Sequence, residues 1–302
     1  MTTVIFDLGG VLIRWAPERA FEQVMPPEAV EEFMEAIGFD EWNRTNDGLR
    51  SIADSEAALA ARFPDKADAI RAYREYFPHT VTEMVPGTGA VLAELNKAGV
   101  ATIALTNWAA DMFAIARERF GILARFSDIV VSGEEGIVKP DPAIYALACR
   151  RAGVEPSDAI FIDDSPPNAA AATDAGLTGL TFTSAEQLRA DMVELGLLGA
   201  AAPVTAPIFH WAPRAEWEAA LASGHYPWSG RGMGYLAEGF VHFSFEHQLP
   251  ATRSRFYADL APEDLTLLRL DPDPDLRIVV EDGFPHLFAE LPVSRVQASE
   301  PA

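Results

Sequence analysis

The chain has 302 residues, of which 49% are hydrophobic and 10% aromatic, so it can bury a sizeable core in one or two domains and is not a disordered protein. Its 45 acidic and 23 basic residues give a formal net charge of −22, which opposes binding to nucleic acid or to an anionic membrane surface, and no basic patch offsets it. Cys149 is the single cysteine, so an internal disulfide and a cysteine-based zinc site are excluded. With no signal-peptide pattern and no apolar run of membrane-spanning length, we expect a cytoplasmic protein.

The first apolar run, from Val4 to Phe6, predicts a buried parallel strand that ends at Asp7. Open α/β sheets place their chemistry at the carboxyl ends of such strands, which makes Asp7 a candidate catalytic residue. Gly9 and Gly10 permit a tight turn whose backbone can approach a ligand closely. The alternative is that Asp7 only caps a turn.

Residues 14–84 show helical patterns and no strand. The expected helices lie at 15–37, 51–63 and 65–77. An all-helical insertion directly after a candidate catalytic strand is typical of a lid over the site. An ordinary helical subdomain fits the same pattern.

From Pro86 the pattern alternates between helices and short apolar strands. Helices are expected at 88–97, 109–120, 143–152 and 168–175, and strands at 100–105, 128–131, 159–162 and 179–182. Helices between strands indicate crossover connections and a parallel sheet. Polar residues follow two strand ends, Thr106-Asn107-Trp108 and Asp163-Asp164-Ser165, and should meet Asp7 at one edge of this sheet.

The stretch around 199–207 is rich in Ala, Pro and Thr and is typical of a linker. Beyond it the composition shifts towards Trp, His, Gly and Pro. Helices are expected at 214–223 and 250–258, and strands at 208–210, 239–244, 265–270, 277–280 and near Leu287. This pattern predicts a small α+β domain.

The strand ends and a nearby loop bring together Asp7, Thr106, Lys139, Asp163 and Asp164. Three carboxylates in one cleft repel each other unless a cation neutralises them, and oxygen-only ligands suit Mg²⁺. A magnesium ion, a lysine and a hydroxyl around a nucleophilic carboxylate would clamp a phosphoryl group and allow an aspartyl-phosphate intermediate. Taken singly, Lys139 could lie in a surface turn, Thr106 could cap a helix, and the acidic pair could be solvated.

Four ordered motifs, FDLGGVL at 6–12, LTN at 105–107, VKPDPAIY at 138–145 and FIDDSPPN at 161–168, resemble those of the haloacid dehalogenase-like (HAD-like) hydrolase superfamily, in the variety with a helical cap after the first motif. The resemblance covers about the first two-thirds of the chain. It implies that Asp7 is the nucleophile and a metal ligand. It further implies that Gly9 offers its carbonyl to Mg²⁺, that Thr106 and Asn107 bind the phosphoryl oxygens, that Lys139 holds nucleophile and phosphate, that Asp164 ligates the metal beside Asp163, and that Asn168 supports the site.

The chain departs from this family at Gly9, where phosphatases usually carry a second Asp that acts as general acid and base. Loss of that proton donor could lower turnover by roughly 10²- to 10⁴-fold. A cap carboxylate, Asp47 or Glu41, could substitute. The related dehalogenases resemble a Ser-Ser-Asn pattern where this chain has Asp163-Asp164-Ser165, so the acidic pair favours phosphate. Trp108, next to a motif, is a candidate substrate contact, although cap and site aromatics more often pack in a core.

The segment from Ile208 to Phe288 resembles a small bacterial domain family of unknown function, number nine hundred and fifty-two. Its members look similar in fold to ADP-ribosyltransferases, which implies a cleft for a nucleotide. His210, His242 and His286 each lie at or beside an aromatic strand, with Ser244 nearby. Each His alone would usually be structural, but together they indicate a shared polar site. Their spacing does not match a zinc site.

We therefore predict an α/β protein with a parallel-sheet Rossmann-like (HAD-like) core, an all-helical cap and a smaller α+β C-terminal domain. The hydrolase domain would span 1–200, with its core at 1–13 and 85–200 and its cap at 14–84, followed by a linker at 201–206 and the second domain at 207–297. The expected activity is Mg²⁺-dependent hydrolysis of a small phosphorylated metabolite. The alternatives are a catalytically weak phosphate-binding or regulatory protein, and a nucleotide-processing enzyme whose chemistry lies in the C-terminal domain.

Overall fold

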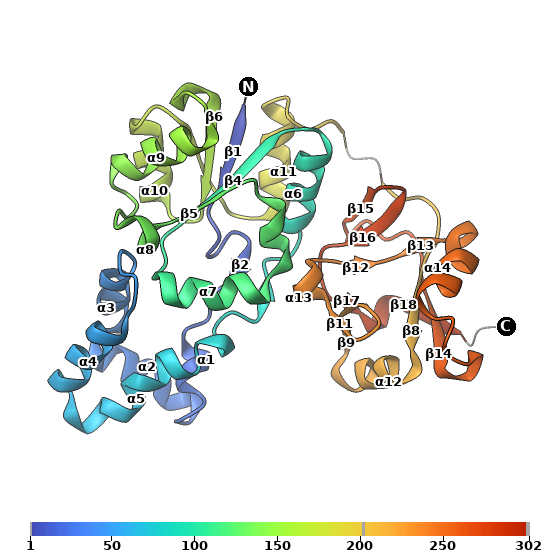
Figure 1. The fold of residues 1–302 in the computed structure, drawn as a ribbon, viewed down its shortest axis with the longest axis horizontal. Helices are drawn as coiled ribbons and strands as arrows, with labels where there is room; N and C mark the ends of the chain where they lie inside the picture. The colour runs from blue at the N-terminus through green and yellow to red at the C-terminus, as the bar shows by residue number, and fades with distance from the viewer. Residues whose placement is uncertain (1, 201–202, 300–302) are drawn as a thin grey trace. The chain divides into compact units, whose positions relative to one another are not determined.

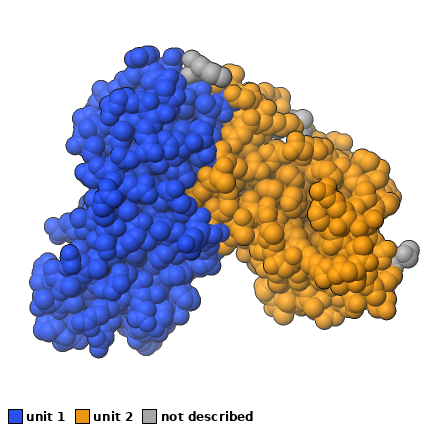
Figure 2. Space-filling view, viewed as in Figure 1, with its two compact units in different colours: residues 1–85, 100–119, 126–184 blue, residues 86–99, 120–125, 185–302 orange. Residues whose placement is uncertain are grey.

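The structure, a computed structural model, describes residues 2–200 and 203–299, so residues 201 and 202 of the predicted linker lie outside the described part. The chain forms two compact units (Figure 1, Figure 2). The first contains residues 1–85, 100–119 and 126–184, and the second contains residues 86–99, 120–125 and 185–302. None of the helices in the described ranges combines the length and the apolar character that a membrane span requires.

The first unit is built on a five-stranded parallel sheet with the strand order β5-β4-β1-β6-β7 (Figure 1). The strands are β1 (Thr3–Phe6), β4 (Ala101–Thr106), β5 (Ile129–Val131), β6 (Ala159–Asp163) and β7 (Thr178–Thr181). In β1, Ile5 lies opposite Ile103 of β4 and Phe161 of β6. The order of the strands reverses at β1, which is where open α/β sheets form their ligand crevice. Asp7 follows β1 directly, so this switch point carries the first candidate residue.

Helices and strands of this unit enclose an apolar core, which explains the continuous hydrophobic runs in the sequence. The helices outside the cap are α7 (Ala110–Arg119), α8 (Ser132–Glu135), α9 (Pro142–Ala152) and α10 (Pro166–Asp174), with a 3₁₀ turn η4 (Pro156–Asp158). Asp141 begins α9 by accepting the backbone N–H of Ala143, and Pro142 occupies the first helical position. Tyr145 of α9 packs against Phe161 of β6 with ring centroids 5.3 Å apart. The predicted parallel α/β core is confirmed.

The insertion after β1 is helical, as predicted, but it is divided differently. It contains α1 (Glu18–Phe21), α2 (Pro27–Ile37), α3 (Phe39–Asn46), α4 (Ala53–Arg62), η1 (Pro64–Lys66), α5 (Ala67–Glu75) and η2 (Phe77–His79). The single helix predicted over 15–37 is wrong, because Pro26 is extended, as expected for a residue before proline, and interrupts it. A short strand pair, β2 (Ile13–Arg14) with β3 (Glu83–Met84), closes the insertion. These strands are too short to give a sequence pattern.

Aromatic side chains form the core of this helical cap. The Tyr73 ring lies 5.1 Å from that of Phe39 and 5.7 Å from that of Trp42, and Phe21 lies 5.5 Å from Phe39. Such edge-on pairs stabilise a core by about 0.5–1.5 kcal/mol each beyond the area they bury. The cap aromatics of this cluster therefore serve packing.

The second unit combines three segments of the hydrolase-like sequence with the C-terminal region. The former are α6 (Thr88–Lys97), η3 (Gly121–Arg125) and α11 (Ala185–Glu194). The C-terminal helices are α12 (Arg214–Ser223), α13 (Tyr235–Glu238) and α14 (Leu249–Phe256), with 3₁₀ turns η5 (Glu246–Gln248), η6 (Pro262–Asp264) and η7 (Val293–Arg295). The strands are β8 (Ile208–Pro213), β9 (His225–Tyr226), β10 (Trp228–Gly230), β11 (Met233–Gly234), β12 (Val241–His242), β13 (Ser244–Phe245), β14 (Leu265–Leu270), β15 (Ile278–Glu281), β16 (Phe284–Leu287), β17 (Leu291–Pro292) and β18 (Val296–Ser299).

Two antiparallel sheets dominate this unit, one with the order β13-β8-β14-β18 and one with the order β12-β16-β15. The single strand predicted over 239–244 is wrong. Gly239 has a φ of +87° that ends α13, and the rest of the stretch forms β12 in one sheet and β13 in the other. Alternation of side chains predicts a strand, but it does not reveal that the strand changes sheets.

Ion pairs hold the hydrolase-like segments to the C-terminal region within this unit. Arg125 of η3 donates to both carboxylate oxygens of Glu281 at 2.8 Å, and its guanidinium lies over the Phe240 and Phe288 rings. Glu94 of α6 forms ion pairs with Arg189 and Arg277. The compact units thus divide the chain differently from the predicted sequence domains, whose boundaries stay a prediction.

Candidate active site

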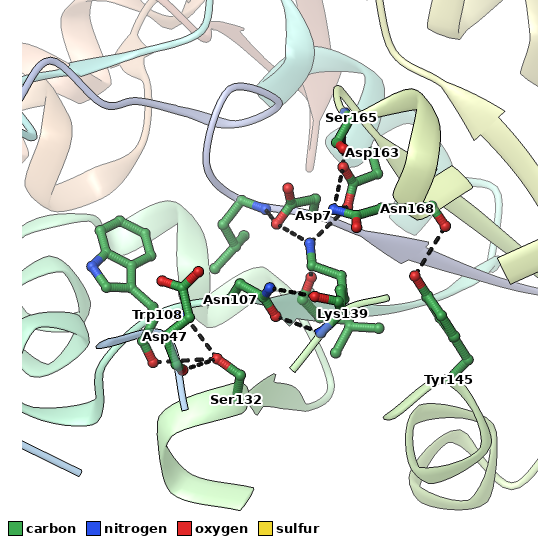
Figure 3. Close-up of polar contacts among 12 residues, drawn as sticks. Asp7, Asp47, Asn107, Trp108, Ser132, Lys139, Tyr145, Asp163, Ser165 and Asn168 are labelled. Carbon is green, nitrogen blue, oxygen red and sulfur yellow. Dashed lines mark hydrogen bonds and ion pairs between the residues drawn. The ribbon is translucent and has the colours of Figure 1, made fainter. Parts of the chain in front are cut away.

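The ends of three parallel strands and one loop bring a lysine and two carboxylates into contact (Figure 3). The Lys139 ammonium lies 2.9 Å from Asp7 Oδ1 and 2.6 Å from Asp163 Oδ2. All three side chains are at most 9% exposed. Thr106, at the end of β4, is 1% exposed, and the carbonyl of Leu105 before it accepts a bond of 3.4 Å from Lys139. Four segments that are far apart in the sequence therefore meet at one point.

Charge is not balanced in this cluster. Burial raises the pKa of Asp7 to about 7 and the nearby Asp163 adds to the rise, although Lys139 opposes it. Burial would lower the pKa of Lys139, but the two carboxylates outweigh that effect and raise it. Lys139 is therefore a firmly protonated cation, and its single positive charge faces two buried carboxyl groups, of which Asp7 ionises less readily than usual. A further cation would relieve the remaining repulsion.

Asp163 has a structural role as well as a place in the cluster. It accepts hydrogen bonds from the backbone N–H of Ser165 at 2.8 Å and from the side-chain amide of Asn168 at 3.1 and 3.2 Å. Asp164, the next residue, is exposed overall. Partial burial of its carboxyl group raises its pKa, and the charge of the neighbouring Asp163 adds to the rise. Carboxylate oxygens of Asp7, Asp163 and Asp164 all lie within 4.8 Å of one another. This set of hard oxygen donors fits Mg²⁺ and does not suit zinc.

The turn after β1 is shaped around Asp164. Gly10 has a φ of +71°, and a Cβ atom there would lie 2.1 Å from Asp164 Oδ2. A Cβ at Gly9 would meet no atom within 4 Å. Only position 10 therefore requires glycine, because the backbone there adopts the left-handed region and passes close to the carboxylate.

Asn107 and Trp108 lie beside Lys139 but make contacts that the sequence did not indicate. The Asn107 side chain pairs with the Lys139 backbone, accepting its N–H at 2.8 Å and donating to its carbonyl at 3.0 Å. The Trp108 ring packs on Phe77 and Phe113, with centroids 6.1 and 5.5 Å apart. Asn107 thereby fixes the backbone that carries the ammonium, and the roles predicted for both residues towards substrate stay predictions.

The four residues predicted in the C-terminal region also converge. His210 Nδ1 lies 2.6 Å from the carbonyl of His242, and the rings of His242 and His286 have centroids 4.9 Å apart. Burial lowers the pKa of His210 to about 4, so its ring is neutral at physiological pH. His210, His242, His286 and Ser244 all line one cavity of about 620 Å³. Ser229, whose hydroxyl is buried and has no partner among the described residues, also lines this cavity.

Comparison with known protein families matches two separate parts of the chain. A family model for haloacid dehalogenase-like hydrolases covers residues 1–176, which is more than half of the chain. The chain belongs to the haloacid dehalogenase-like hydrolase family. A second family model, DUF952, a protein of unknown function, matches residues 211–299. Both resemblances drawn from the sequence motifs are confirmed.

Relatives of this HAD-like hydrolase include phosphatases. Protein CbbY of Cereibacter sphaeroides is 30% identical over 68% of this chain and 98% of its own length. A phosphoserine phosphatase from Thermus thermophilus is 31% identical over 39% of this chain, which spans 45% of that relative's length. A structure from Porphyromonas gingivalis, described as a predicted HAD-like family hydrolase, has a TM-score of 0.50 and 19% identity, covering 65% of this chain and 97% of its own. At that identity it shows the fold alone.

Two residues of the HAD-like site carry contacts that the sequence reading missed. Ser132 follows β5, accepts the backbone N–H of Trp108 at 2.8 Å and donates to the backbone carbonyl of Asp47. Gly10 makes room for Asp164. The pattern of polar residues after strand ends, which indicated Thr106 and Asp163, would also have indicated Ser132. For Gly10 the sequence indicated the tight turn but not the contact with Asp164, because that contact depends on the path of a distant segment.

Proposed function

We propose that the first unit is a Mg²⁺-dependent phosphatase that acts on a small phosphorylated metabolite through an aspartyl phosphate on Asp7. The observation that carries the proposal is the buried contact of one ammonium with two carboxylates at the strand ends, with a third carboxylate in reach. The relatives support phosphate chemistry, because they include the phosphoserine phosphatase described above and two proteins named phosphoglycolate phosphatase. They also favour an enzyme over the alternative of a binding or regulatory protein.

The metal would be held by the Asp7 and Asp164 carboxylates and the Gly9 backbone carbonyl, with Asp163 beside them. The donor chemistry supports this, because three carboxylates within 4.8 Å of each other are all hard oxygen ligands. The turn at Gly10 supports it independently, because a Cβ there would collide with Asp164, so glycine leaves room for this proposed metal ligand. When bound, Mg²⁺ would neutralise charge on the phosphoryl oxygens and orient the phosphate.

In the proposed mechanism the Asp7 carboxylate attacks phosphorus and the bond from phosphorus to the ester oxygen breaks, leaving the phosphoryl group on Asp7. Water then attacks phosphorus, the acyl phosphate bond breaks and Asp7 is regenerated as a carboxylate. Lys139 would hold Asp7 and the phosphoryl group, because fixed positive charge stabilises the charge that develops on the oxygens. Thr106 and Asn107 would donate hydrogen bonds to the same oxygens. Asp163 and Asn168 would keep Lys139 in position.

Hydrolysis of p-nitrophenyl phosphate tests this function most directly. We expect phosphate release by the full chain to require Mg²⁺, to stop with a chelator and to be lost in Asp7→Asn. Asp174→Asn, which removes an exposed carboxylate at the end of α10, is the matched control and should retain the wild-type rate. Equal release by wild type and Asp7→Asn would refute the proposal. A panel of phosphorylated metabolites would then identify the substrate class.

The nucleotide that the resemblance implies for the C-terminal region stays a prediction. The one structural observation in its favour is the cavity around His210 with the unpartnered Ser229 hydroxyl. Thermal shift of the full chain with NAD or ADP-ribose would test it, since the segments 86–99 and 120–125 pack with this region and a C-terminal fragment would lose them. A shift that Ser229→Ala abolishes would support the nucleotide, and its absence at saturating ligand would count against it.

A further inference from the structure

The proposed reaction needs a proton donor that the residues around Asp7 do not supply. An alkoxide is a poor leaving group, so the departing ester oxygen must take up a proton. Gly9 has no side chain to provide one. The Lys139 ammonium is engaged by Asp7 and Asp163, and the Asn107 amide does not titrate. The proton donor must therefore come from another element.

The loop from Asp47 to Ile52 follows the last turn of cap helix α3 and is fixed against the core of the first unit. The Leu49 carbonyl accepts the N–H of Ala110 at 3.0 Å, and the Arg50 carbonyl accepts that of Asp111 at 3.1 Å. Asp111 Oδ2 in turn accepts the N–H of Ile52 at 3.2 Å. Ser132, buried behind Trp108, donates to the Asp47 carbonyl. These bonds hold the Asp47 backbone next to the loop that carries Trp108, whose N–H donates to Ser132. The next residue, Gly48, lies against Val138, since a Cβ at Gly48 would be 3.3 Å from Val138 Cγ1, and Val138 precedes Lys139.

The carboxylate of Asp47 is free to act. In Figure 3 the backbone of Asp47 faces Ser132, while its carboxylate points away from that contact, towards the part of the view where Asp7 lies. It forms no hydrogen bond or ion pair within the described residues, but it does interact electrostatically with Lys139. The neighbouring Asn46 is 2% exposed and neither of its amide atoms has a partner among those residues. Unpaired buried polar atoms beside a free carboxylate favour a polar ligand there.

We propose that Asp47 of the cap is the general acid and base of the reaction, in place of a side chain at Gly9. This inference rests on the proposed phosphatase function. In the first step the Asp47 carboxyl gives its proton to the ester oxygen as the bond to phosphorus breaks, so the alcohol leaves and Asp47 becomes a carboxylate. In the second step Asp47 takes a proton from the water whose oxygen attacks phosphorus, while the bond to Asp7 breaks. Phosphate is released and Asp47 is protonated again.

The ionisation of Asp47 agrees with this role. Burial raises its pKa to about 6, and the cations of Lys139 and Arg44 only partly oppose the rise. Tyr73, whose pKa is raised mainly by burial and further by the Asp47 charge, is a third titratable group that interacts with it. A carboxyl with that pKa can both give and retake a proton near neutral pH. Glu41, the other cap carboxylate considered from the sequence, lies exposed in the first turn of α3, at the opposite end from Asp47.

Asp47→Asn in the full chain tests the proposal with two substrates. For the alkyl phosphate that wild type hydrolyses fastest, we expect kcat to fall by about 10²- to 10⁴-fold. For p-nitrophenyl phosphate the first turnover should stay fast, because p-nitrophenolate leaves without a proton, and turnover should then stall with one equivalent of phenolate released. Glu41→Gln is the matched control and should keep the wild-type kcat. Asp47→Asn that keeps kcat within about threefold on both substrates, or that shows no burst, would overturn the proposal.

Two measurements distinguish the proposed acid–base role of Asp47 from a merely structural one. The thermal shift that beryllium fluoride with Mg²⁺ produces, which reports an intact Asp7 site, should be the same in Asp47→Asn and wild type. A lost shift would indicate a structural role and overturn the proposal. The fall of kcat/KM for the alkyl phosphate as pH rises above about 6, which reports loss of the Asp47 proton, should also disappear in the variant.

A carboxyl at position 9 should restore turnover. The backbone at Gly9 is not in the left-handed region and a Cβ there meets nothing within 4 Å, so the position accepts a side chain. We expect Gly9→Asp to recover kcat at least about tenfold in the Asp47→Asn background, whereas Gly9→Asn does not. Equal turnover of the two double variants counts against the proposal. A wild-type chain no more active than Asp7→Asn would remove the phosphatase function itself, whereas an active wild type with an equally active Asp47→Asn removes only this inference.

Discussion

We expect Gly10→Ala to raise the Mg²⁺ concentration needed for phosphate release by about 10- to 100-fold, the range observed when the support of a metal ligand is disturbed. Two effects act at this residue. Its φ of +71° costs an alanine about 1–2 kcal/mol, and the new Cβ would lie 2.1 Å from Asp164 Oδ2. Asp164 is exposed, so its side chain can rotate away for roughly 0.5–1.5 kcal/mol. The carboxylate then leaves its place beside Asp7.

Gly153→Ala separates the two effects. Gly153, which ends α9 in the same unit, has a φ of +69° and no atom within 4 Å of a built Cβ, so its alanine variant carries the backbone cost alone. Both variants should lower Tm by about 2–8 °C, at roughly 2–4 °C per kcal/mol. Only Gly10→Ala should shift the Mg²⁺ dependence of p-nitrophenyl phosphate hydrolysis. If the two variants need the same Mg²⁺ concentration, Asp164 does not support the metal and the reasoning fails.

Three further predictions concern buried charge and contacts. Lys139→Met should lower the free energy of unfolding in urea at pH 7.5 by about 3–5 kcal/mol, because it leaves Asp7 and Asp163 buried without a cation. Acidification protonates Asp7, whose pKa is raised, and should therefore reduce the difference in stability between variant and wild type. A difference that grows on acidification would contradict this. In the second unit, burial would raise the pKa of Glu281, but hydrogen bonds from His286 and Arg125 lower it to about 2. The stabilisation that Glu281 provides is therefore present above pH 4.5 and lost as pH falls towards 2. The Tm of Glu281→Gln should lack that acid-dependent loss, and parallel curves of Tm against pH for variant and wild type would refute the prediction. Ser132→Ala removes the bonds to Trp108 and Asp47 and should cost about 1–3 kcal/mol in urea unfolding while lowering kcat, whereas an unchanged kcat would show that Asp47 needs no such support.

The sequence by itself determined the parallel core and most of the cluster at its edge. Continuous apolar runs such as that before Asp7 can only be buried on both faces, which requires a parallel sheet with crossover helices. Parallel strands end at one edge, so polar residues after them, Asp7, Thr106 and Asp163, had to converge. Local chemistry also set element ends, as at Asp141 and Pro142 of α9.

Only the tertiary structure decided which side chains touch. No pattern in the sequence reveals that Asn107 holds the Lys139 backbone or that Gly10 lies against Asp164, because each contact depends on the path of a second, distant segment. Between Asp47 and Glu41 the sequence left the choice open, since both are acidic residues of the cap segment between the expected helices at 15–37 and 51–63. Docking of the 47–52 loop on the core selects Asp47, because hydrogen bonds across the fold fix its position and burial sets its pKa.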